Sequence, residues 1–112
     1  MMPGDVDPGA PIDLDHLAAQ TFGSVDLEHE VLRLFLAQSC QCVERLLQEP
    51  DARVAHLLLG SARGIGARGV ERAAAVLEDM LLRGERSAEA ELAALAKAVE
   101  TANRFIEARL SR

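Results

Sequence analysis

The spacing of apolar residues constrains the fold of this chain more than any other feature of its sequence. Between residues 27 and 48 they recur every three or four positions, which is the period of one face of an α-helix. Gln38 is a single polar residue within that row. A long amphipathic helix is therefore predicted to end near residue 48. The row and a second one beside it consist of Leu27, Val31, Leu34, Phe35, Cys42 and Leu46, with Leu32, Leu36, Val43 and Leu47.

Four further segments show the same helical period, and we find no strand pattern. Capping and terminating residues set their limits. The connections of two to six residues favour an antiparallel up-and-down arrangement. We predict an all-α fold, an antiparallel four-helix bundle with a short extra N-terminal helix. The further helices are expected at residues 14–23, 52–66, 68–83 and 88–110, with caps at Asp13, Asp26, Asp51 and Ser87 and stops at Gly23, Pro50 and Gly84.

Length and composition limit the class of protein. A chain of 112 residues makes one domain. Residues 1–12 hold three of the four prolines and are predicted to be a flexible tail before a domain at 13–112. Aromatic residues make up only 3% of the chain, which disfavours a β-sandwich. The net charge of −6 argues against a nucleic-acid partner.

Membrane, export and metal functions are also disfavoured. No apolar run approaches the roughly 20 residues that span a bilayer, and the acidic N-terminus does not resemble a signal peptide. Cys40 and Cys42 are too few for a disulfide framework or a four-ligand zinc site. We therefore expect a cytoplasmic protein with reduced thiols, with neither a metal nor a cofactor of its own.

The segment around His56 carries the candidate chemistry. A helix advances about 100° per residue, so Val54, Leu58, Ser61 and Ile65 should form a buried stripe opposite this histidine. On the exposed side, Arg63 lies at about −20° from His56, Gly60 at +40°, Arg53 at +60° and Leu59 at −60°. The imidazole should therefore face solvent among two cations and a glycine.

This exposed side suits a group that carries phosphate. A glycine inside a helix costs about 1 kcal/mol relative to alanine, so Gly60 calls for a reason, and it would clear an approach to the ring. Arg63 could neutralise an anion held on His56. The residues alone leave other interpretations open: His56 as an ordinary surface residue, Gly60 or Gly64 as points of close helix contact, or a helix end that frays.

Residues 56–67 read HLLLGSARGIGA and resemble the signature of histidine-containing phosphotransfer (HPt) domains, commonly H-T-L-K-G-S-A-x-x-[LI]-G-A. The likeness extends more weakly through the order of helices from residue 14 to residue 110. It implies a four-helix bundle whose second long helix exposes a histidine that carries a phosphoryl group. The matching residues are His56, Leu58, Gly60, Ser61, Ala62, Gly66 and Ala67.

The resemblance also implies roles for single residues. His56 would accept the phosphoryl group, Gly60 would open the docking surface, and Glu78, twenty-two residues after the histidine, would orient the ring. The family's usual lysine is replaced here by Leu59. Arg63 is therefore expected to supply the charge. Leu57, Leu59 and Arg53 are expected on the partner face.

The implied partners are receiver domains of response regulators, and a hybrid histidine kinase is another candidate. The protein would be a monomeric covalent carrier rather than a self-contained enzyme, because the sequence holds no nucleotide-binding loop or kinase motif. Mg²⁺ is expected only on the receiver. Two alternatives are a helical adaptor or docking module without phosphate chemistry, and a helix-turn-helix DNA binder, which the net charge disfavours.

Overall fold

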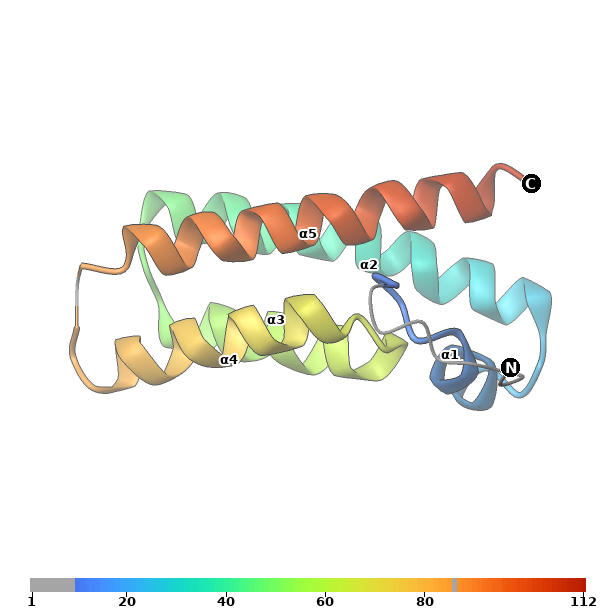
Figure 1. Ribbon diagram of the computed structural model, residues 1–112, viewed down its shortest axis with the longest axis horizontal. Coiled ribbons are helices and arrows are strands. Elements are labelled where there is room, and N and C mark those ends of the chain that lie inside the picture. The colour runs from blue at the N-terminus through green and yellow to red at the C-terminus, as the bar shows by residue number, and fades with distance from the viewer. Residues whose placement is uncertain (1–9, 86) are drawn as a thin grey trace.

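A computed structural model describes residues 10–85 and 87–112, and within these ranges the protein is all-helical (Figure 1). The radius of gyration is 14.3 Å. The prediction of an all-α fold is confirmed. The helices are α1 (Leu14–Gln20), α2 (Val25–Gln48), α3 (Ala52–Ile65), α4 (Arg68–Leu82) and α5 (Glu89–Leu110).

The long helices α2 to α5 lie side by side, and α1 lies at the end where α3 turns into α4 (Figure 1). Helix α3 packs against α2 and α4, and α5 packs against the same two helices from the other side. Helix α1 contacts α3. The core lies between these helices because each turns its apolar face inward. Its fully covered large side chains include Leu32, Leu46, Leu58, Leu77, Leu95 and Ile106.

Side-chain caps start the first three helices. Asp13 accepts a hydrogen bond from the backbone N–H of His16, and Asp51 accepts one from that of Arg53. Both caps confirm the predictions. Helix α2 differs, because its cap is Ser24, whose hydroxyl accepts from the N–H of Leu27, two residues before the predicted cap at Asp26. Both Ser24 and Asp26 are residue types that cap helices, so sequence alone did not separate them.

The cap predicted at Ser87 is wrong. Ala88 occupies the N-cap position of α5, without a side-chain hydrogen bond. The predicted stop at Gly84 is confirmed, since α4 ends at Leu82 and Gly84 adopts a φ of +81°, a left-handed conformation that glycine tolerates.

The predicted tail includes one core residue. Ile12 is only 1% exposed, and the backbone N–H of Asp13 donates to the carbonyl of Gly66 at 2.8 Å. The segment before α1 is thus fixed against the α3–α4 turn, so the tail cannot extend to residue 12. Residues 1–9 of the predicted tail lie outside the described residues.

Two polar pairs lie between packed helices, and one of them includes Gln38, the polar residue of the predicted apolar row. Gln38 on α2 accepts a hydrogen bond from Ser61 on α3 at 2.6 Å. Asn103 on α5 donates to the hydroxyl of Ser39 on α2 at 3.1 Å. Each pair satisfies its polar groups by hydrogen bonding, which explains how Gln38 is accommodated on an apolar face. Among the described helices, none is long and apolar enough to cross a membrane.

Candidate functional site

Helix α3 presents His56 to solvent. The side chain is 72% exposed, whereas Val54, Leu58 and Ile65 on the opposite face are each less than a tenth exposed. Ser61, the fourth residue of the predicted stripe, is half-buried and bonded to Gln38. The predicted orientation of the histidine is therefore confirmed.

Glu78 on α4 lies directly beside the imidazole. Its Oε2 is 2.8 Å from Nδ1 of His56, and its side chain is 19% exposed. An ionised carboxylate only accepts hydrogen bonds, so Nδ1 must carry the proton that joins them. In the neutral ring, Nε2 then has the free lone pair and is the nucleophilic nitrogen. The packing of α4 against α3 thus brings together the two residues that the resemblance linked across twenty-two positions.

Gly60 leaves open space on the same face. A Cβ built at Gly60 would meet no described atom within 4 Å, and the same holds for Gly64. Neither glycine serves a close helix–helix contact, so that interpretation is wrong. The helix continues through both residues to Ile65, and Gly66 forms its C-cap with a φ of +80°. A Cβ there would come within 3.0 Å of Asp13, so Gly66 is the glycine that close packing requires.

Leu59 does not lie on the partner face, which corrects a prediction. It is only 7% exposed and belongs to the core. Helix α3 packs against both α2 and α4, and a helix with two neighbours buries a wider arc than the predicted stripe. Leu57, in contrast, is 47% exposed and remains available for contact with a partner.

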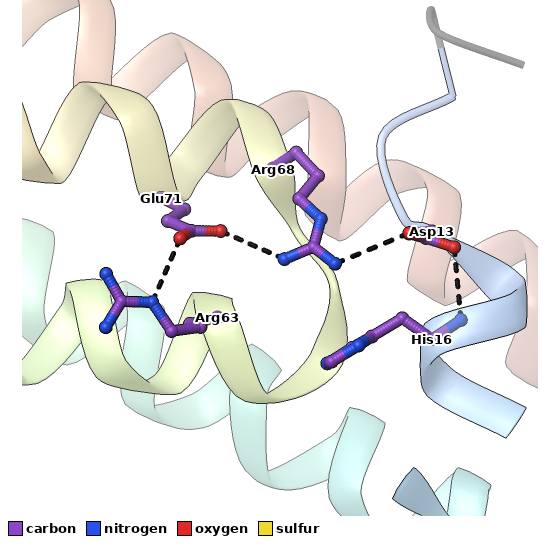
Figure 2. Close-up of polar contacts among 5 residues, drawn as sticks. All are labelled: Asp13, His16, Arg63, Arg68 and Glu71. Carbon is purple, nitrogen blue, oxygen red and sulfur yellow. Dashed lines mark hydrogen bonds and ion pairs between the residues drawn. The ribbon is translucent and has the colours of Figure 1, made fainter. Parts of the chain in front are cut away.

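Arg63 is held by a carboxylate of the neighbouring helix. Its Nε donates to Oε2 of Glu71 at 3.0 Å, and the other oxygen of Glu71 accepts from Arg68 at 3.2 Å. Arg68 also reaches Asp13 at 3.4 Å, so a chain of ion pairs joins α3, α4 and the cap of α1 (Figure 2). The Arg63 hydrogen bond is the main reason why the pKa of Glu71 is lowered. The cation expected to serve His56 is therefore already paired.

Arg53 lies at the start of α3 and is 92% exposed. Its guanidinium pairs with the carboxylate of Asp51, the residue that caps the helix. These contacts lower the pKa of Asp51, chiefly through the side-chain hydrogen bond. Arg53 thus faces solvent as predicted, but its charge is directed to the cap.

The periodicity did not single out the ion pairs around Glu71. The helical spacing of Arg68 and Glu71, three positions apart, is a signal for a pair within α4. The pair between Arg63 and Glu71 crosses the α3–α4 turn and depends on its geometry. No sequence pattern of single helices contains that geometry.

The described part of the chain contains no group of three or more His, Cys, Asp or Glu side chains that could hold a metal ion. Cys40 is exposed and Cys42 is buried, and both are free thiols. Burial raises the pKa of the Cys42 thiol, in agreement with its predicted packing. His29 on α2 is half-buried.

In comparisons with known proteins, no family model, no curated protein and no solved structure matches the chain.

Proposed function

We propose that this protein is a phosphorelay carrier of the histidine phosphotransfer type. His56 accepts a phosphoryl group from the aspartate of one receiver domain and passes it to another. The observation that carries the proposal is an exposed imidazole whose Nδ1 is held 2.8 Å from the carboxylate of Glu78. In this interpretation α2 to α5 form an antiparallel four-helix bundle and α1 is the extra N-terminal helix. The monomeric carrier acts in the cytoplasm.

The transfer follows from the protonation state of the ring. Nε2 of neutral His56 attacks the phosphorus, the N–P bond forms as the P–O bond to the receiver aspartate breaks, and that aspartate leaves as a carboxylate. The proton stays on Nδ1, so the product ring is a cation. Glu78 stabilises it because an opposite charge within hydrogen-bond distance favours the charged form. The reverse sequence delivers the group to the next receiver.

The receiver supplies what this chain does not. Mg²⁺ belongs on the receiver beside its aspartate, and this chain positions the imidazole and stabilises charge. It therefore acts as a carrier and not as a self-contained enzyme. The open space at Gly60 allows the receiver surface to approach the ring, and Leu57 offers an exposed apolar contact beside it.

The decisive experiment mixes the purified protein with a receiver domain phosphorylated on its aspartate. We expect a label on this chain that is labile in acid and stable in alkali, as a phosphohistidine is. His56→Gln should remove the label, whereas the matched control His29→Gln should retain it.

Two results would contradict the proposal. A label that persists in the His56→Gln variant would place the chemistry on another residue. Receivers that bind without labelling His56 would instead favour the adaptor or docking module.

A further inference from the structure

The guanidinium of Arg63 is oriented along α3. Its hydrogen bond to Glu71 uses Nε, and its two Nη groups are turned away from that carboxylate and from the α3–α4 turn (Figure 2). Side chains on a helix lean toward its N-terminus. The Nη groups therefore point in the direction of His56, whose Cα is about 10 Å away along the helix axis.

Open space separates the two residues. Gly60 follows His56 by one turn and precedes Arg63 by nearly one turn, on the same side of α3. A Cβ at Gly60 would meet no neighbouring group within 4 Å, so the space over Gly60 is open. The long Arg63 side chain, 63% exposed, can extend across this surface without displacing a packed group.

Glu71 has a second cation that remains when Arg63 leaves. Its Oε1 accepts from Nη1 of Arg68, which is fixed in turn by Asp13 at the cap of α1. A carboxylate that is 21% exposed would be costly to leave alone. Because Arg68 stays in place, the departure of Arg63 leaves Glu71 neutralised.

We propose that Glu71 is a positioning residue that binds the Arg63 side chain while His56 is unmodified. A phosphoryl group on His56 then draws the Arg63 guanidinium away from Glu71 and over Gly60 toward the phosphoryl oxygens. This inference rests on the proposed function of His56. No covalent bond changes: Arg63 exchanges one oxyanion for another, and the new partner carries more negative charge. Arg68 retains Glu71, and through Asp13 the exchange is connected to α1.

The expected effect on rate is moderate. Exposed ion pairs contribute little to stability, so breaking the pair between Arg63 and Glu71 opposes transfer by at most about fivefold. Glu71→Gln should therefore speed phosphorylation of His56 by up to about fivefold. Arg63→Ala should slow it, and Glu71→Gln should have no effect on rate in the Arg63→Ala background. Glu100→Gln is the matched control, because Glu100 also pairs with an arginine but lies on α5.

A spectroscopic experiment tests the exchange without a receiver. Phosphoramidate, a small phosphoryl donor, is used to phosphorylate His56, and the Arg63 Nε–H signal is followed by ¹H–¹⁵N NMR. In the unmodified protein this signal should shift upon Glu71→Gln substitution. Phosphorylation of wild type should shift it as well, and the phosphorylated forms of both proteins should give closely similar signals.

The outcomes separate the two proposals. The proposed exchange would be overturned if the Arg63 Nε–H signal did not change on phosphorylation. It would also be overturned if Glu71→Gln still changed the transfer rate in the Arg63→Ala background. Failure of a phosphorylated receiver to label wild type would overturn the proposed function instead, and the phosphoramidate experiment would still report whether Arg63 moves.

Discussion

Replacing Glu78 by alanine should slow phosphoryl transfer more than it weakens receiver binding. The substitution removes the carboxylate that lies 2.8 Å from Nδ1 of His56. Two effects act in the same direction. The proton is no longer held on Nδ1, so part of the population presents the wrong nitrogen. The positive charge that develops on the ring during transfer also loses its nearest opposite charge.

The magnitude follows from the geometry of the pair. A hydrogen bond to a charged group contributes about 1.5–3 kcal/mol when it is well shielded from water. The His56 side chain is 72% exposed, so solvent screens much of this interaction. A loss of about 1–1.5 kcal/mol of transition-state stabilisation remains, which corresponds to a decrease in rate of roughly five- to tenfold. Glu78→Gln should fall between wild type and alanine, because its amide oxygen still accepts from Nδ1–H without the charge.

Rapid-quench transfer from a phosphorylated receiver, measured over a range of receiver concentrations, separates the maximal rate from the apparent affinity. Asp79→Ala is the matched control, because it removes the adjacent carboxylate of α4, which is 68% exposed and pairs with Arg83. A normal maximal rate with a large loss of affinity would place Glu78 in the docking interface. Equal effects of the two alanine substitutions would refute the assignment to ring orientation.

Three other predictions test the site and the fold. His56→Gln should abolish labelling and change the free energy of unfolding by less than about 0.5 kcal/mol in urea titrations, because the side chain is exposed; unfolding of the variant would contradict this. Gly60→Arg should block receiver binding measured by calorimetry while the free domain stays folded; unchanged binding would show that this surface is not approached. Glu28→Gln should lower the free energy of unfolding by about 1–3 kcal/mol, because it disrupts the partly buried pair with Arg109 between α2 and α5. The hydrogen bond from Arg109 lowers the pKa of Glu28. The pair therefore contributes to stability above about pH 4.5, and this contribution is lost as the pH falls further. Urea titrations of wild type and variant at several pH values can measure this loss.

The sequence was sufficient to predict the helical class and the exposed side of α3. Both predictions rest on the helical period averaged over many residues. A single residue of unexpected polarity therefore hardly changes the predicted helix or its exposed side. Gln38 shows this robustness: a polar residue on an apolar row did not disturb the prediction, and the structure bonds it to Ser61. The caps were less predictable, because Ser24 and Asp26 are both good capping residues and a difference of two positions decides between them.

The position of Glu78 could not be derived from the period of α4. Helical angles state which residues of one helix share a face, but the contact between His56 and Glu78 depends on how two helices are rotated against each other. That rotation is fixed by packing across the whole interface, including the turn at Gly66. The resemblance supplied the pairing, and the structure provides the distance.

The misplacement of Leu59 arose from treating α3 as if a single neighbour covered it. The predicted stripe was narrow and centred opposite His56, yet Ala55, Leu59 and Ala62 are also buried. A helix that packs against both α2 and α4 buries a much wider arc, and Leu59 falls within it. The consequence for the site is chemical. This leucine turns inward, so the position of the family's lysine contributes no charge here. Under the proposed function, Arg63 is the candidate cation for the phosphoryl group, and its side chain can reach back toward His56 because Gly60 leaves open space on the exposed side.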